Sequence, residues 1–197
     1  MSYYRIFRGF FRIIFSLVFR WQVIGREHIP KEGPVILCAN HISLWDPPLL
    51  GSGIERQVNF MAKEELFRIP GLNFLLVKFG AFPVKRGAGD RAAIRATLKL
   101  LEEGKIFGIF PEGTRSKTSE LGEGMPGVAM FALKSQAMVI PVAIIGPYRM
   151  FRPVKIVYGK PIDLTHLRET KTGSDTLKAT SDLIMSHIKE LRDQHLP

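Results

Sequence analysis

The stretch VILCANHISLWDPP, residues 35–48, is the part of this 197-residue chain that decides its fold. Its first five residues are continuously apolar and follow a turn-rich lead-in, which is typical of a fully buried strand. His41 and Asp46 come next, five positions apart. On a helix these two side chains would point about 140° apart, and on a strand they would face opposite sides of the sheet. They can meet only across a bend, which Pro47 favours because it disfavours helical geometry at the preceding residue.

Two interpretations of His41 and Asp46 remain open at this point. An imidazole at a strand end, held by a carboxylate from the next turn, is suited to general-base catalysis. Alternatively, His41 is a core histidine and Asp46 is the N-cap of a helix that has Pro47 at its first position. Spacing does not separate the two interpretations, because an isolated His/Asp pair is common.

Outward from this stretch, short apolar runs alternate with amphipathic segments. A chain of this length is most simply one domain. The alternation predicts a single α/β domain with a mixed, largely parallel sheet flanked by helices. We expect further strands at residues 58–62, 80–84, 105–110, 138–145 and 154–158, and helices starting at 46 and over 64–77 (two short ones), 90–103, 126–136 and 174–194.

The N-terminal segment carries polar residues three or four positions apart on an otherwise aromatic and aliphatic helix: Arg5, Arg8, Arg12, Ser16 and Arg20. Arginine interrupts the segment too often for a membrane-spanning helix, and the layout of a secretory signal is missing. We therefore predict that residues 1–24 form an amphipathic helix lying on a membrane surface, with the main domain at residues 25–197. The alternative is an ordinary amphipathic helix packed on the domain.

The formal net charge of +10 favours an anionic partner, which could be nucleic acid, anionic lipid or a phosphorylated substrate. The N-terminal arginines lie beside bulky apolar residues and no nucleic-acid motif is recognised, so we expect an anionic membrane surface and no nucleic acid. Cys38 is the single cysteine, which excludes an internal disulfide and suggests a reducing compartment. The expected location is the cytoplasmic face of the cell membrane, as a peripheral or monotopic protein.

Three polar clusters follow predicted strands, at residues 40–46, 85–86 and 112–115. Ligands of open α/β sheets gather beyond the carboxyl ends of strands, so we expect the clusters to converge on one crevice. Arg115 follows Gly113 and Thr114 in a loop whose backbone N–H groups and guanidinium suit a phosphate. No serine-hydrolase elbow, nucleotide-binding glycine motif or paired-cysteine or HExxH metal motif is present. A base, a carboxylate and phosphate-binding arginines suit direct group transfer to the hydroxyl of a phosphorylated substrate.

Four blocks of sequence resemble the glycerolipid acyltransferases, and most closely the bacterial 1-acylglycerol-3-phosphate branch of that family. The blocks are NHISLWD at residues 40–46, FPVKRG at 82–87, FPEGTRS at 110–116 and VIPV at 139–142. The NHxxxxD pattern is weak alone, whereas FPEGTRS at this distance together with the other two blocks is specific. The resemblance covers over half of the chain.

The resemblance implies an enzyme of phospholipid synthesis. It would transfer a fatty acyl group from acyl-CoA or acyl-carrier protein to the sn-2 hydroxyl of lysophosphatidic acid and so produce phosphatidic acid. No metal and no cofactor beyond the acyl donor are implied. Other acceptors, such as glycerol-3-phosphate or a lysophospholipid, remain open, and a basic membrane-surface binding module is the non-enzymatic alternative.

The resemblance also assigns roles to single residues. His41 would be the general base, and Asp46 would orient its imidazole and stabilise the imidazolium. The other assignments are Arg86 and Arg115 with the Thr114 loop for the acceptor phosphate, Glu112 as support for that site, Gly113 N–H and Lys63 as donors to the oxyanion, and Pro141 on the acyl-donor side.

Overall fold

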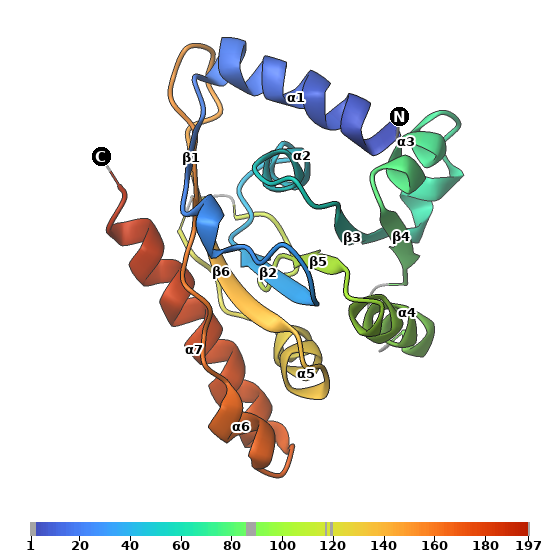
Figure 1. Ribbon diagram of the computed structural model, residues 1–197, viewed down its shortest axis with the longest axis vertical. Helices are drawn as coiled ribbons and strands as arrows, with labels where there is room; N and C mark the ends of the chain where they lie inside the picture. The colour runs from blue at the N-terminus through green and yellow to red at the C-terminus, as the bar shows by residue number, and fades with distance from the viewer. Residues whose placement is uncertain (1–2, 86–89, 117, 119, 197) are drawn as a thin grey trace.

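The computed structural model describes residues 3–85, 90–116, 118 and 120–196, which form a seven-stranded sheet covered by helices on both faces (Figure 1). The strands are β1 (Gln22–Ile24), β2 (Val35–Ala39), β3 (Val58–Lys63), β4 (Ala81–Val84), β5 (Ile106–Ile109), β6 (Met138–Ile145) and β7 (Lys155–Tyr158). The helices are α1 (Tyr3–Phe19), α2 (Asp46–Ser52), α3 (Leu72–Lys78), α4 (Arg91–Glu102), α5 (Pro126–Lys134), α6 (Thr165–Glu169) and α7 (Ser174–Asp193), with 3₁₀ turns η1 (Arg26–His28) and η2 (Glu64–Arg68).

The strand order in the sheet is β1-β7-β6-β2-β5-β3-β4. The five strands from β6 to β4 pair in parallel, whereas β7 pairs antiparallel to β6 and β1 pairs parallel to β7. The predicted mixed, largely parallel sheet is therefore confirmed. Because five parallel strands end at one edge, the loops that follow them share that edge.

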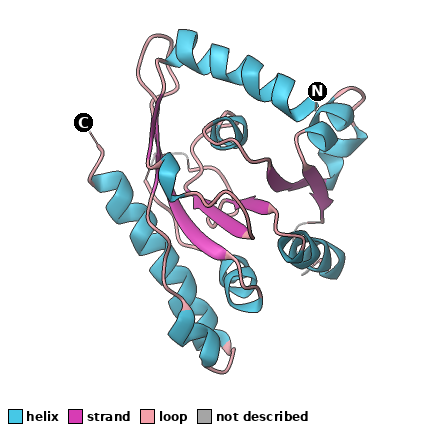
Figure 2. Ribbon diagram, in the orientation of Figure 1, coloured by secondary structure: helices cyan, strands magenta, loops and turns pink. Residues whose placement is uncertain are grey.

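The central strand β2 contributes to the core on both faces of the sheet. Val35, Leu37 and Ala39 pack with residues of α1 and α2, whereas Ile36 and Cys38 pack with residues of α4, α5 and α7. All five side chains are inaccessible to solvent, as predicted from their continuous apolar character. Burial raises the pKa of the Cys38 thiol, which fits a structural rather than a reactive cysteine. Figure 2 shows the resulting helix–sheet–helix layers.

The helix α1 is shorter than the predicted 1–24, because residues 22–24 form the strand β1 instead. Two of its arginines, Arg8 and Arg12, point into the fold, whereas the prediction placed them beside a lipid-facing surface. Arg8 is buried, and its guanidinium pairs with the Glu55 carboxylate at 2.6 Å. Arg12 donates to the Ser52 carbonyl at 2.9 Å and to Glu55 at 2.8 Å. The hydrogen bond from Arg12 holds the pKa of Glu55 below its ordinary value. Arg12 thus satisfies a carbonyl at the carboxyl end of α2, where a helix dipole favours positive charge, and Arg8 binds the segment that follows the helix.

The strand β1 continues the same sheet by pairing with β7. Phe15 and Phe19 of α1 are buried in the same core cluster as Val35 and Leu49. The segment before residue 25 is therefore packed into the fold, and the membrane role that we predict for it is a question about its outer surface alone.

Candidate active site

The end of β2 is held in register with β6 by Asn40. Its buried side-chain amide donates to the Ile144 carbonyl at 2.9 Å and accepts from the Ile144 N–H at 2.7 Å. An amide side chain that satisfies both polar groups of one peptide acts as a short extension of the strand pairing. His41 therefore leaves the sheet from a fixed point.

His41 and Asp46 meet across a tight turn. His41 Nδ1 lies 2.7 Å from Asp46 Oδ2, and the same carboxylate oxygen accepts the backbone N–H groups of Ile42 at 2.6 Å and Ser43 at 2.7 Å. The Asp46 side chain is fully buried, whereas 16% of the His41 side chain is exposed. Because Nδ1 is held by the carboxylate, Nε2 is the nitrogen available to accept a proton. The predicted bend and the predicted pair are both present.

The alternative interpretation of Asp46 as a helix N-cap is wrong, because Trp45 takes that position. The helix α2 begins at Asp46 and shows no side-chain capping bond. Pro47 and Pro48 follow, and neither has an N–H group that a cap could accept. The carboxylate turns back to the preceding loop and to His41, where donors are available.

The third sequence block holds the backbone of His41 on both sides. The Glu112 carboxylate accepts the His41 N–H at 2.8 Å and the Gly122 N–H at 2.9 Å. The Ser116 N–H donates to the His41 carbonyl at 2.8 Å. Glu112 is buried and both of its oxygens are engaged, so it supports the site rather than contacting substrate. The predicted convergence of the first and third clusters is thus observed.

Two further residues contact the His41–Asp46 pair, and neither was predicted from the sequence as part of the site. The Phe110 ring stacks on the His41 imidazole with centroids 4.1 Å apart and an interplanar angle of 19°. The Tyr148 hydroxyl donates to Asp46 Oδ1 at 2.7 Å. Phe110 belongs to the third block and Tyr148 follows β6 at the shared edge, so a search of every loop at that edge would have included both.

The loop after β5 borders an open cavity of about 380 Å³. Thr114 and Arg115 are exposed and line it. Gly113 adopts a positive φ of 67°, and its N–H donates to the Phe110 carbonyl at 3.0 Å. The full lining is Glu112, Thr114, Arg115, Ser116, Thr118, Glu120, Leu121, Gly122 and Glu123. A guanidinium at the rim of a cavity that adjoins the His41 loop suits an anionic group of a substrate.

The comparisons with known proteins give the family of the chain. A family model described as "Acyltransferase" matches residues 20–145, a range that contains the His41–Asp46 pair and the Arg115 loop. The chain belongs to the acyltransferase family.

Two of the similar proteins match this chain over nearly its whole length. A 1-acyl-sn-glycerol-3-phosphate acyltransferase of Bacillus subtilis is 32% identical over 97% of this chain and 98% of its own length. A lyso-ornithine lipid O-acyltransferase of Pseudomonas aeruginosa is 34% identical over 68% of this chain and 50% of its own length. The crystal structure of the 1-acyl-sn-glycerophosphate acyltransferase PlsC of Thermotoga maritima is similar with a TM-score of 0.75 and 29% identity, covering 95% of this chain and 79% of that one.

For three residues of this acyltransferase, Lys63, Arg86 and Pro141, the predicted roles stay predictions. Lys63 is exposed at the end of β3, and its predicted oxyanion role stays a prediction. Arg86 lies outside the residues that the structure describes. Pro141 is buried inside β6, where its carbonyl accepts the Gly159 N–H at 2.8 Å. That contact gives Pro141 a place in the core, and its role on the acyl-donor side also stays a prediction.

Proposed function

We propose that this acyltransferase acylates the sn-2 hydroxyl of lysophosphatidic acid with acyl-CoA or acyl-carrier protein as the donor, giving phosphatidic acid. One observation carries the proposal: the loop that bears Arg115 also holds the backbone of His41. A phosphate bound at Arg115 would therefore lie at a defined offset from the His41 imidazole. The names of the relatives support the same acceptor.

The geometry suits a direct transfer. Nε2 of His41 takes the proton of the acceptor hydroxyl as its oxygen attacks the thioester carbonyl. The C–S bond then breaks, and the imidazolium returns the proton to the leaving thiolate. Asp46 stabilises the imidazolium throughout, as carboxylates do in catalytic triads. In the structure the Gly113 N–H is engaged by the Phe110 carbonyl, so its proposed bond to the oxyanion requires that this turn bond lengthens or is shared.

Replacing Arg115 with alanine tests the acceptor. We expect the KM for lysophosphatidic acid to rise at least about tenfold, because a charge-assisted bond to the phosphate is lost. The KM for acyl-CoA should change little. The measurement is initial rate against acceptor concentration, and the control is Arg91→Ala, which removes an exposed arginine on α4.

A panel of acceptors decides between the proposal and its closest alternative. The similarity to a lyso-ornithine lipid O-acyltransferase makes an acceptor without phosphate the second candidate. Wild-type protein is given one acyl-CoA and, in turn, lysophosphatidic acid, glycerol-3-phosphate, a lysophospholipid with a larger head group and lyso-ornithine lipid. The proposal fails if lysophosphatidic acid is not acylated while another acceptor is.

The membrane surface that we propose for this enzyme is the outer side of α1. Five large apolar side chains lie exposed along the helix: Tyr3, Ile6, Phe10, Ile13 and Leu17. Leu17 is 69% exposed, and soluble proteins rarely leave such rows uncovered. Among the described residues, no helix combines the length and apolar character that crossing a bilayer requires.

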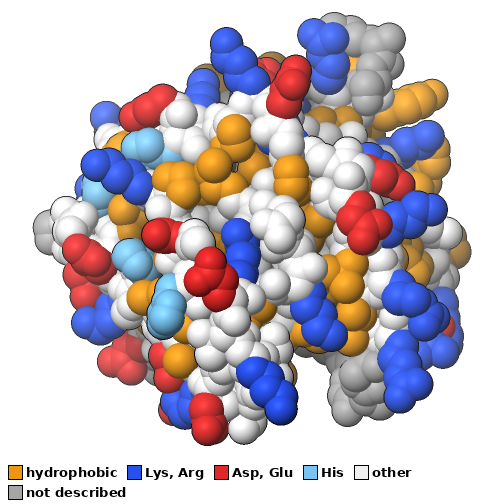
Figure 3. Space-filling model, turned by 60° about the horizontal axis from the view of Figure 1, so that its bottom comes forward, with side chains coloured by type: hydrophobic (Ala, Val, Ile, Leu, Met, Phe, Trp, Pro, Cys, Tyr) orange, Lys and Arg blue, Asp and Glu red, His pale blue; other side chains and the backbone are white. Residues whose placement is uncertain are grey.

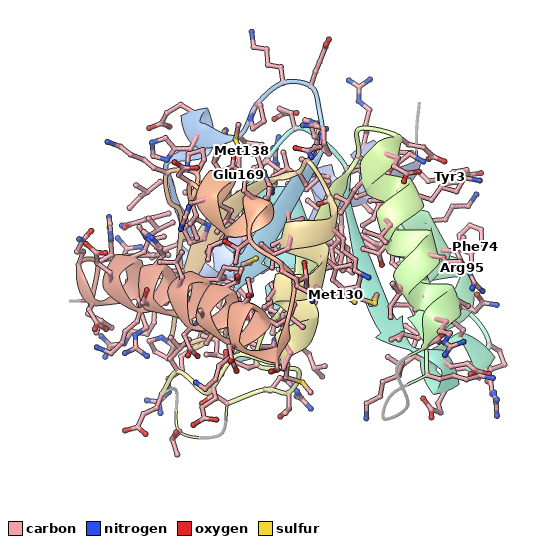
Figure 4. The ribbon with its side chains drawn as sticks, turned by 90° about the horizontal axis from the view of Figure 1, so that it is seen from below. Tyr3, Phe74, Arg95, Met130, Met138 and Glu169 are labelled. Atoms are coloured by element: carbon pink, nitrogen blue, oxygen red, sulfur yellow. The ribbon has the colours of Figure 1, made fainter. Side chains whose placement is uncertain are left out.

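Figure 1 shows α1 along the top of the molecule, with α3 at its N-terminal end and the loop after β6 at its other end. At the N-terminal end the Tyr3 and Phe74 rings lie 6.1 Å apart, and Figure 4 labels both. At the other end the exposed Phe151 donates its N–H to the Val18 carbonyl at 2.7 Å, beside exposed Met150. The view in Figure 3, turned by 60° so that the bottom of the molecule in Figure 1 comes forward, shows positive and negative side chains intermixed with the apolar ones. The continuous apolar row therefore marks the side that we expect to contact lipid.

The paired substitution Ile13→Asp/Leu17→Asp tests this surface. Both side chains are exposed, so we expect thermal stability to be kept while binding to vesicles of phosphatidylcholine and phosphatidylglycerol falls at least about tenfold. The measurement is co-sedimentation with vesicles. Leu196→Asp, which places a charge on an exposed apolar residue near the C-terminus, is the control. Unchanged binding of the paired variant would exclude this face.

A further inference from the structure

The buried carboxylate of Asp46 has two oxygens with different partners. Oδ2 accepts three donors, from His41 Nδ1 and the N–H groups of Ile42 and Ser43. Oδ1 accepts the Tyr148 hydroxyl at 2.7 Å. Among the described residues, Tyr148 is the one side chain that donates to Oδ1. An ionised carboxylate in a site without solvent access needs a donor for each oxygen.

The phenol of Tyr148 is held facing the Asp46 carboxylate, to which it donates. Its ring packs edge-on against Phe19 with centroids 5.6 Å apart, and the residue is half-buried. Burial first, and then the negative charge of Asp46 and the hydrogen bond to it, raise the pKa of the phenol well above its ordinary value. The hydroxyl therefore stays protonated, and its proton points to Asp46.

The position of Tyr148 depends on the same strand as that of His41. Tyr148 follows β6 by three residues, and Ile144 in β6 is the residue that Asn40 binds through both of its backbone groups. One strand therefore fixes the start of the His41 loop and the loop that carries the phenol.

We propose that Tyr148 is a positioning residue of the acyl transfer, because its hydroxyl fixes the rotation and charge distribution of the Asp46 carboxylate that orients His41. Tyr148 itself touches neither substrate in the proposed mechanism. Its loss should therefore lower the rate of the chemical step and leave substrate binding unchanged. The inference rests on His41 as the base of the reaction proposed above.

The first test is Tyr148→Phe, which removes the hydroxyl and keeps the ring against Phe19. We expect kcat to fall about tenfold, with the KM of donor and acceptor within about twofold of wild type. The matched control is Tyr158→Phe. It removes another buried phenol, which donates to the Leu50 carbonyl of α2 at 2.8 Å, so it costs a comparable bond on the same helix without touching Asp46. A kcat reduced equally in both variants would reduce Tyr148 to a packing residue and overturn the proposal.

The second test needs no activity, so it separates this inference from the proposed function. The proton between His41 Nδ1 and Asp46 is followed by NMR in protein labelled with nitrogen-15 at histidine. We expect its resonance to shift in Tyr148→Phe and to stay in place in Tyr158→Phe. An unmoved resonance in Tyr148→Phe would show that the phenol does not influence the pair, whatever acceptor the enzyme uses.

Discussion

Replacing His41 with alanine is expected to lower the rate of acyl transfer by about 10³-fold or more. The substitution removes the Nε2 lone pair that accepts the hydroxyl proton, and the structure shows no second imidazole in contact with Asp46 among the described residues. The Asp46 carboxylate keeps the donors from Ile42, Ser43 and Tyr148, so the turn should remain folded. The measurement is the initial rate with saturating donor and acceptor, together with circular dichroism and a thermal melt.

The control for this variant is His166→Ala, which removes an exposed imidazole on α6. It should keep full activity. Replacing His41 with alanine leaves an empty space beside the Phe110 ring, which could destabilise the protein. His41→Gln is therefore a second variant: the glutamine amide fills part of that space and cannot act as a base. A folded His41 variant that retains a turnover near that of wild type would remove the imidazole from the mechanism.

Asp46→Asn is expected to reduce kcat by about 10²- to 10⁴-fold while preserving the shape of the site. The asparagine carbonyl can take the place of Oδ2 and accept the three donors from His41, Ile42 and Ser43. Its amide then faces the Tyr148 hydroxyl, which can rotate to act as acceptor. The variant therefore loses the negative charge and little else.

The expected cause of the lower kcat in Asp46→Asn is the unstabilised imidazolium, so the loss should appear in kcat with KM nearly unchanged. Asp46→Ala is the contrasting variant: it leaves two backbone N–H groups without the carboxylate, and it should lower the melting temperature as well. Activity of Asp46→Asn within about threefold of wild type would show that the charge is not used.

Local patterns predicted the parts of the site that are local in the chain. The apolar run at Val35–Ala39 is a buried central strand, and the bend that Pro47 favours brings His41 to Asp46. The convergence of the first and third clusters could be predicted because parallel strands end at one edge. Each of these inferences depends on spacing within a few residues or on a general rule of sheets.

The features that could not be predicted from the sequence depend on contacts between residues far apart in the chain. Glu112 accepts the N–H of His41, which lies 71 positions earlier, and Tyr148 donates to Asp46 across 102 positions. The inward arginines of α1 were misassigned for the same reason. Helical periodicity shows that Arg8 and Arg12 share a face, but only the packed structure shows that the end of α2 and the Glu55 carboxylate lie opposite that face.

Because α1 is packed into the fold, deletion of the helix is not a suitable test of its role in membrane binding. Deleting the helix would expose the core around Phe15 and remove the cations from the end of α2, whose first residue is Asp46. Loss of activity in such a deletion would not report on lipid. Substitutions confined to the outer row, with the inner arginines kept, separate membrane binding from the integrity of the site.

The most direct test of the account is product formation by purified protein on vesicles that contain lysophosphatidic acid, with one acyl-CoA, followed by mass spectrometry of the lipids. The account predicts that wild-type protein forms phosphatidic acid carrying the donor's acyl chain, and that His41→Ala forms none above the uncatalysed background. Formation of phosphatidic acid by the folded His41→Ala protein at the wild-type rate would contradict it.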